Sequence, residues 1–156
     1  KKFKDLKIAW IGDGNNVCNS LIFGCSKTQT QIVIATPKGF EPNPEVVKKS
    51  SKYTVVDLTT DPKSAVKDAD IVMTDTFTSI HTSDPKRTEK FLPSFQVNDS
   101  LMEKAKNDAI FMHCLPAKRE QEVTSSVIDG PQSVVWDEAE NRLHTQKALL
   151  LSLLSI

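Results

Sequence analysis

The sequence predicts a single α/β domain in three layers, with a mostly parallel, doubly wound sheet covered by helices on both faces. Short β-branched runs alternate with helical stretches along all 156 residues. No internal repeat and no Pro/Gly/Ser-rich linker divides the chain, and its length suits one domain with a sizeable core.

Six strands are expected from runs rich in Ile, Val and Thr. They cover residues 7–11, 31–35, 54–58, 71–74, 110–112 and 133–136. Turns that contain glycine or proline end the first two runs, at 12–14 and at 36–39.

Five helices are expected between and after these strands. They cover residues 17–27, 44–51, a segment that begins at 61–62, 98–106, and 141 to the end. In the first helix, Leu21, Ile22 and Cys25 share one face. Pro44 falls in the first turn of the second helix, where proline is favoured, and Asp61 is a suitable N-cap for the third.

Composition excludes several classes of protein. The 20 Lys+Arg balance 20 Asp+Glu, and a net charge of zero argues against a nucleic-acid partner. The longest apolar stretch, 148–156, is far shorter than the roughly 20 residues that a membrane span needs. Three cysteines cannot all pair within the chain, and the first residues do not resemble a secretory signal, so we expect a reducing, intracellular setting.

Ligands of doubly wound sheets bind beyond the carboxyl ends of the strands, near the point where strand order reverses. The first such segment, 12–16, reads GDGNN and opens a helix. Nicotinamide binding is disfavoured, because a third glycine is replaced by Val17 and no acid follows the second strand. Two alternatives stay open: Asn15 and Asn16 hold a small polar ligand such as a carboxylate, or one of them caps the helix.

The second segment follows the fourth predicted strand and begins with Asp75. This carboxylate either binds an ammonium group, with Ser79 adding a hydroxyl, or caps a helix or turn. The stretch 81–92 is polar and charged, which is typical both of a loop that closes over a ligand and of a passive surface loop.

The third segment, 113–116, reads HCLP and follows the fifth strand. Cys114 is an activated thiolate, a proton acceptor or an inert buried thiol. Further along, Arg142 suits a phosphate or carbonyl oxygen, unless it pairs with Asp137 or Glu138. The Cys and His residues show no spacing typical of metal ligands, so no metal is expected.

Four motifs in this order resemble the ornithine-binding half of the ornithine carbamoyltransferase family. They are WIGDGNN at 10–16, DTFTS at 75–79, HCLPA at 113–117 and EAENR at 138–142, and the similarity covers essentially the whole chain. The resemblance implies that residues 1–156 form a Rossmann-like ornithine-binding domain of a longer enzyme that uses no cofactor. Such an enzyme transfers the carbamoyl group of carbamoyl phosphate to the δ-amine of L-ornithine, giving L-citrulline and phosphate.

The resemblance also assigns the residues that bind ornithine. Position by position, Asn16, Asp75 and Ser79 would hold its α-amino and α-carboxylate groups. Ile80 stands where the family usually makes a backbone contact through methionine.

The same resemblance assigns the reacting groups. Cys114 would lie beside the δ-amine, and the Leu115 carbonyl would accept hydrogen bonds from this amine and from the carbamoyl NH2. Arg142 would bind and polarise carbamoyl phosphate, and the bond from Leu115 to Pro116 would be cis. These roles suit the chemistry, because an alkyl ammonium with a pKa of about 10.4 must lose a proton before it attacks.

Two departures from the family qualify this interpretation. The family usually reads Ser-Met-Gly where this chain reads Ser79-Ile80-His81, and a histidine in place of glycine bears on loop closure and side-chain specificity. The chain also has no Ser-x-Arg-Thr motif, which binds the phosphate in the family. We therefore expect the N-terminal carbamoyl-phosphate domain to be absent from this chain and the domain alone to be inactive.

Two other functions stay open: transfer to another amine or amino acid, and amino-acid binding without catalysis. For a full-length enzyme the resemblance implies a homotrimer, in the cytoplasm or, in a eukaryote, in the mitochondrial matrix.

Overall fold

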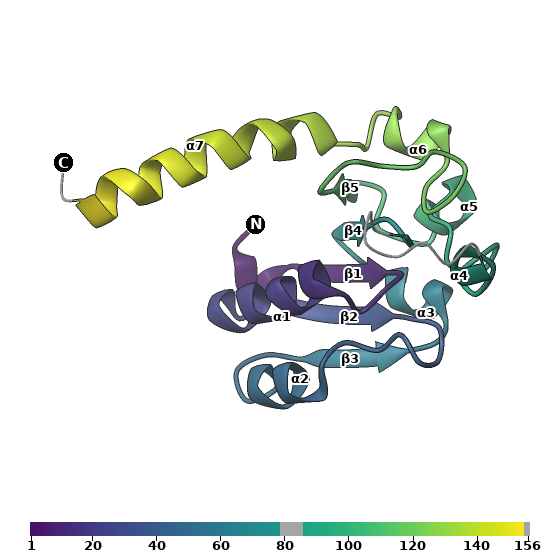
Figure 1. Cartoon of the computed structure of the whole chain (residues 1–156), viewed down its shortest axis with the longest axis horizontal. Coiled ribbons are helices and arrows are strands. Elements are labelled where there is room, and N and C mark those ends of the chain that lie inside the picture. Colours follow the sequence, from purple (N-terminus) through teal and green to yellow (C-terminus); the bar gives the residue numbers. More distant parts are fainter. Residues whose placement is uncertain (79–85, 155–156) are drawn as a thin grey trace.

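In the computed structural model, five parallel strands form one sheet in the order β3-β2-β1-β4-β5 (Figure 1). The structure describes residues 1–78 and 86–154. The strands are β1 (Lys7–Ile11), β2 (Gln31–Ala35), β3 (Val56–Thr59), β4 (Ile71–Thr74) and β5 (Ile110–His113). The chain moves outward from β1 to β3 and then continues on the other side of β1, so strand order reverses between β1 and β4. The predicted doubly wound parallel sheet is confirmed.

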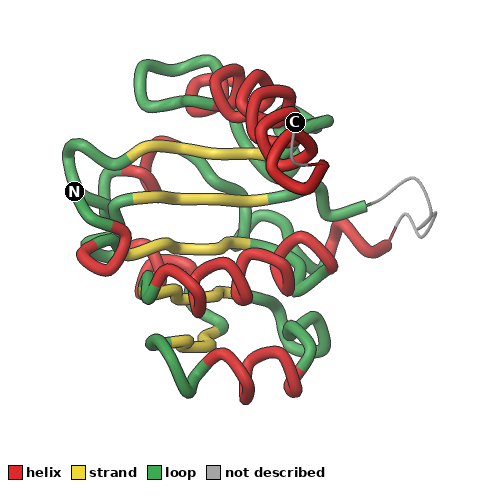
Figure 2. The backbone as a smooth tube through the Cα atoms, turned by 90° about the vertical axis from the view of Figure 1, so that its left-hand side faces the viewer, coloured by secondary structure: helices red, strands yellow, loops and turns green. Residues whose placement is uncertain are grey.

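Helices cover both faces of the sheet (Figure 2). After a 3-10 turn at Phe3–Asp5 they are α1 (Asn16–Thr28), α2 (Pro44–Ser50), α3 (Pro62–Val66), α4 (Lys86–Glu89), α5 (Asp99–Met102), α6 (Ser125–Ile128) and α7 (Val135–Leu154). Proline opens α2 and α3, and Asp61 caps α3 by accepting a hydrogen bond from the Lys63 N–H, as expected.

Alternate residues of β1 face two separate cores, as the period of a strand requires. Trp10 is fully buried in the core that also contains Ile22 of α1. Ile11 is fully buried on the opposite face, in the core that contains Val66 of α3 and Phe111 of β5. The sheet is therefore the middle layer of three.

The predicted sixth strand at 133–136 is wrong. Ser133 forms only an isolated bridge with Phe111, and the helix α7 already begins at Val135 rather than at 141. Asp137 and Glu138 lie in the first turn of α7, where negative charge stabilises the helix N-terminus. The helix expected over 98–106 is also shorter, because after α5 the chain tightens into turns.

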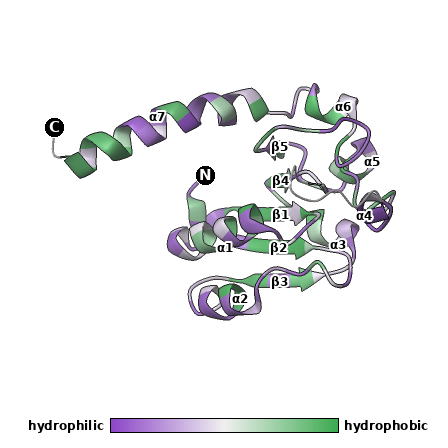
Figure 3. Ribbon diagram, in the orientation of Figure 1, coloured by the Kyte–Doolittle hydropathy of each residue, from purple (hydrophilic) through white to green (hydrophobic). Residues whose placement is uncertain are grey.

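The helix α7 projects away from the rest of the domain (Figure 1). Val135 is its only buried residue, and hydrophobic positions alternate with polar ones along it (Figure 3). Its large exposed apolar side chains are Trp136, Leu143, Leu149, Leu150, Leu151, Leu153 and Leu154. Among the described residues, no helix combines the length and the apolar character that a membrane crossing requires.

The second glycine of the GDGNN turn has a structural role. The Gly14 N–H donates to the Phe40 carbonyl at 2.8 Å. A Cβ on Gly14 would lie 2.2 Å from the Pro42 nitrogen, which real Cβ atoms do not tolerate. The backbone at Gly14 therefore lies directly against the segment 40–42, and this contact holds the start of α1 in place.

We predict that Gly14→Ala lowers the free energy of unfolding by about 2 kcal/mol, because two backbone segments must separate. Urea unfolding of the 156-residue chain measures the change. The matched control is Gly24→Ala in α1, where nothing lies within 4 Å of the added Cβ. That variant should gain up to about 1 kcal/mol from helix propensity. Equal stability of the two variants would contradict the prediction.

Candidate functional site at the strand ends

The carboxyl ends of β1, β4 and β5 lie level with one another. Ile11 pairs with Thr74, and Thr74 pairs with His113. The residues that follow the last two strands, Asp75 and Cys114, therefore emerge side by side. This is the edge of the sheet at which strand order reverses, where the fold predicts a ligand site.

Asn15 connects the first helix to this edge. Its Oδ1 accepts hydrogen bonds from the N–H groups of Val17 at 3.0 Å and Cys18 at 3.1 Å, so Asn15 is the N-cap of α1. Its Nδ2 donates to Oδ2 of Asp75 at 2.7 Å. Oδ1 of the same carboxylate accepts from the Thr76 N–H at 2.7 Å. Asp75 is only 8% exposed and is held in a fixed orientation.

Cys114 is a protonated thiol in this setting. Its Sγ donates to Oδ1 of Asp75 at 3.4 Å. Burial, followed by the negative charges of Asp75 and Glu138, raises the pKa of the thiol to about 12. Among the described residues, no positive charge lowers this pKa, so the structure favours the thiol over the activated thiolate at neutral pH.

His113 organises the backbone on both sides of the thiol. Its Nδ1 accepts from the Leu115 N–H at 2.9 Å, so the ring proton lies on Nε2, 3.3 Å from Oε1 of Glu122. The His113 N–H donates to Oε2 of Glu138 at 3.0 Å. Leu115 has a φ of +53°, and its bond to Pro116 is cis, as expected. The side chains of His113 and Glu122 are fully buried.

Glu122 was not identified from the sequence. It lies in an irregular segment, and no spacing signal relates it to the HCLP motif. Among the described residues, its Oε2 has no hydrogen-bond partner, although it is buried. Its other oxygen also accepts from the Lys118 N–H at 2.5 Å, so Glu122 fastens the loop that follows Pro116.

Arg142 lies beside Cys114 and Leu115. All three line a cavity of about 530 Å³, together with Trp136 and Arg119. Of the two expected competitors for Arg142, Glu138 accepts from the His113 N–H, and within the described residues the Arg142 guanidinium pairs neither with Glu138 nor with Asp137. Arg119 differs, because both its Nε and Nη2 donate to the Asp129 carboxylate. Arg142 is thus available to a ligand of this cavity.

Asn16 is the exposed first residue of α1 and adjoins Asn15. Ser79, Ile80 and His81 lie outside the described residues, as does much of the expected loop 81–92. The structure thus brings Cys114 into contact with Asp75, and it places Cys114, Leu115 and Arg142 on one cavity. Asn16 is linked to this group only through its chain neighbour Asn15, which donates to Asp75.

Arg87, which the sequence did not single out, anchors the chain after residue 85. Its guanidinium pairs with Asp13 and donates to the Phe77 carbonyl at 2.8 Å through Nε. It also lies 4.7 Å from the centre of the Phe40 ring. Burial raises the pKa of Asp13, and Arg87 opposes that shift. The second part of the stretch 81–92 is therefore packed against the GDGNN turn.

The residues at this edge could hold a metal only by giving up existing bonds. One ligand atom each from Asp75, His113 and Cys114 lie within 4.8 Å of one another. Both imidazole nitrogens, however, already face hydrogen-bond partners, and the Cys114 pKa of about 12 opposes the thiolate that a metal requires. The arrangement fits a positively charged or hydrogen-bonding organic ligand better.

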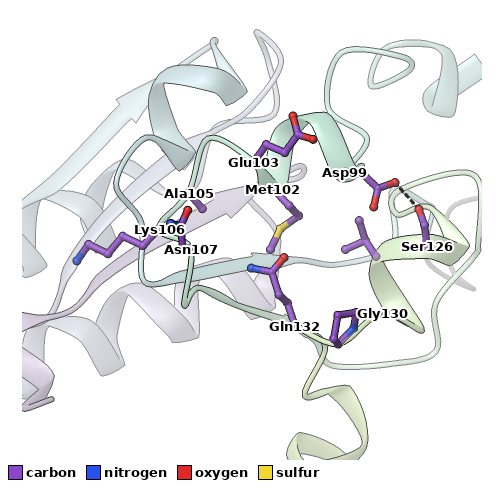
Figure 4. A pocket seen from close by; sticks show the side chains of 11 residues that line it. Asp99, Met102, Glu103, Ala105, Lys106, Asn107, Ser126, Gly130 and Gln132 are labelled. Atoms are coloured by element: carbon purple, nitrogen blue, oxygen red, sulfur yellow. Dashed lines mark hydrogen bonds between the residues drawn. The ribbon is translucent and has the colours of Figure 1, made fainter.

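A second hollow of about 490 Å³ lies beside α5 and α6 (Figure 4). Asp99 and Ser126 are joined by a hydrogen bond at one side of it, and Lys106 points away. Of the residues expected to bind substrate, none of those that the structure describes lines this hollow.

These features define a doubly wound α/β domain that holds a buried carboxylate and a thiol at its strand ends, with an arginine on the cavity beside the thiol that has no partner among the described residues. Residues 4–153 match the Asp/Orn binding domain of the aspartate/ornithine carbamoyltransferases. The chain belongs to the aspartate/ornithine carbamoyltransferase family.

Individual relatives agree with this assignment. The chain is 63% identical to an ornithine carbamoyltransferase of Cenarchaeum symbiosum, over 97% of this chain and 50% of the relative. Among solved structures, the ornithine carbamoyltransferase of Pyrococcus furiosus is 47% identical with a TM-score of 0.88, over 94% of this chain and 49% of that one. The anabolic enzyme of Campylobacter jejuni is 35% identical with a TM-score of 0.90, over 97% and 52%. The chain thus spans about half the length of the relatives it matches.

We predict that alkylation of Cys114 by iodoacetamide keeps accelerating up to about pH 10, because the thiolate fraction rises about tenfold per pH unit below the pKa. Mass spectrometry separates Cys114 from the buried Cys18 and Cys25. Asp75→Asn should accelerate the reaction at pH 9, since it removes a negative charge, whereas Asp57→Asn on exposed β3 should not. A plateau near pH 9 in the parent chain would contradict the prediction.

Proposed function

We propose that this chain is the acceptor-binding half of an ornithine carbamoyltransferase. The complete enzyme would transfer the carbamoyl group of carbamoyl phosphate to the δ-amine of L-ornithine, giving L-citrulline and phosphate. The observation that carries this proposal is the contact between the Asp75 carboxylate and the Cys114 thiol, because Cys114 also lines a cavity with Arg142, which has no partner among the described residues.

The buried carboxylate favours an amino-acid ligand with a free amine. Among the described residues, Asp75 accepts hydrogen bonds from neutral donors, namely Asn15, Thr76 and Cys114. A buried carboxylate is stabilised most by an opposite charge, which the α-ammonium group of ornithine supplies. Asn16, Ser79 and Ile80 would complete this subsite, as the family resemblance implies.

The reacting groups would then meet between Cys114 and Arg142. The δ-ammonium group first loses one proton to solvent water. The amine nitrogen then forms a bond to the carbamoyl carbon while the bond from that carbon to the phosphate oxygen breaks, and the second proton that the nitrogen gives up leaves with the phosphate as HPO4²⁻. The Leu115 carbonyl, fixed by the bond from its own N–H to His113, would accept hydrogen bonds from the amine and the carbamoyl NH2. Arg142 would stabilise the negative charge that develops on the carbamoyl oxygen.

The other half of the active site would lie outside this chain. Its relatives are about twice as long, and the sequence lacks the Ser-x-Arg-Thr motif. We propose that a carbamoyl-phosphate domain precedes the chain and packs on the exposed leucines of α7. By family resemblance, the complete protein would be a homotrimer in the cytoplasm or the mitochondrial matrix.

We predict that the isolated chain binds L-ornithine in calorimetry but forms no citrulline when carbamoyl phosphate is added. Asp75→Asn should weaken binding at least about tenfold, because a charge-assisted hydrogen bond contributes about 1.5–3 kcal/mol. Asp57→Asn removes an equal charge on β3 and should bind normally. Citrulline formation by the isolated chain, or unchanged binding by Asp75→Asn, would refute the proposal.

Arg142 can be tested in a chimaera that joins this chain to the other half of its Cenarchaeum symbiosum relative. We expect Arg142→Gln to lower kcat by about 100-fold or more, since it removes a group that stabilises developing charge. The dissociation constant for ornithine should stay within about twofold. Arg119→Gln is the matched control, because Arg119 lines the same cavity but is paired with Asp129. Equal losses in both variants would argue against the role of Arg142.

A further inference from the structure

Asn15 does more than cap α1. We propose that Asn15 is the positioning residue of the site: its amide fixes the Asp75 carboxylate so that one oxygen faces Cys114 and the other keeps a free acceptor position for the ammonium group of the ligand. This inference rests on the proposed function for the identity of the ligand, but the geometry of the carboxylate does not depend on it.

The orientation of the Asn15 amide follows from its partners. Two N–H groups of α1 point at one end of the amide, so that end is the oxygen. The opposite end is therefore the NH2 group, and it lies 2.7 Å from Oδ2 of Asp75. Reversing the amide would place the NH2 group against two donors and the oxygen against a carboxylate. Three favourable contacts thus fix one orientation.

The backbone of Asn15 is fixed as well. The side-chain amide of Asn19 donates to the carbonyl oxygens of Gly14 at 3.1 Å and of Asn15 at 2.7 Å. Oδ1 of Asn19 accepts from the Asn43 N–H at 2.9 Å. Hydrogen bonds through Asn19 therefore connect Asn15 to α1 and to the segment before α2. Because its backbone is fixed in this way, the Asn15 amide holds the Asp75 carboxylate in one position.

The acceptor positions of Asp75 show what remains for a ligand. A carboxylate oxygen accepts about two hydrogen bonds. Oδ1 already accepts from the Thr76 N–H and the Cys114 thiol. Oδ2 accepts from Asn15 alone among the described residues, which leaves one position there. Asn15 thus determines which oxygen a bound ammonium group can approach.

Two substitutions separate positioning from helix capping. Asn15→Ser keeps a good N-cap but removes the donor to Asp75. Asn15→Asp also keeps the cap, and it places a second carboxylate against the first. If Asn15 acts only as an N-cap, both variants should bind L-ornithine and undergo alkylation at Cys114 as the parent chain does. A positioning role predicts a changed site in a folded protein, which circular dichroism and urea unfolding verify.

We expect Asn15→Ser to raise the dissociation constant for L-ornithine about tenfold in calorimetry. Alkylation of Cys114 by iodoacetamide at pH 9 should become several times faster, because the carboxylate is free to turn away from the thiol. Asn15→Asp should weaken ornithine binding further. The matched control is Asn43→Ser, since Asn43 caps α2 in the same way but does not contact Asp75.

The proposal would be overturned if Asn15→Ser binds L-ornithine with the affinity of the parent chain and its Cys114 is alkylated at the parent rate. Asn15 would then be an N-cap only. If Asn15→Ser does not fold, Asn15→Thr provides the same comparison, because threonine is also an N-cap residue. If the parent chain fails to bind ornithine, the proposed function fails. The alkylation rate then still decides the role of Asn15: a faster reaction supports it, and an unchanged reaction overturns it.

Discussion

The parallel register of β1, β4 and β5 is the constraint on which the site depends. Because Ile11, Thr74 and His113 lie level across three strands, the polar groups that follow them emerge at one height. A shift of one residue in either pairing would turn the side chains at that strand end to the opposite face of the sheet. The two apolar cores hold this register, so the chemistry of the edge depends on packing that lies well below it.

Around this edge, polar side chains are buried at positions where apolar side chains would cost less free energy. His113 and Glu122 are fully buried, and one oxygen of Glu122 has no partner among the described residues. Such burial costs free energy, and so does the positive φ of Leu115. The pair holds the Leu115 N–H and the loop after Pro116 in one conformation. The domain therefore gives up some stability to fix the backbone beside Cys114.

Local patterns in the sequence predict the strands well, because each strand is a short β-branched run that ends in a turn. Expected and observed bounds coincide for β1, β2 and β4. The run at 133–136 misleads for the same reason: its β-branched residues favour a strand, but tertiary contacts allow only one bridge before α7 begins. Of the site, the sequence indicates the groups that follow strands. It does not reveal Arg87 or Glu122, since their partners Asp13 and His113 are brought to them only by folding.

The attachment of α7 has a mechanical consequence. The helix is joined to the domain at its first turn, where Val135 is buried and Glu138 accepts the hydrogen bond from the His113 N–H. With 20 residues it extends for about 30 Å. Its attachment point adjoins Cys114. A tilt of about 10° at the first turn would displace the far end of the helix by about 5 Å. Whatever rests on the distant leucines is geometrically linked to the backbone that carries Cys114.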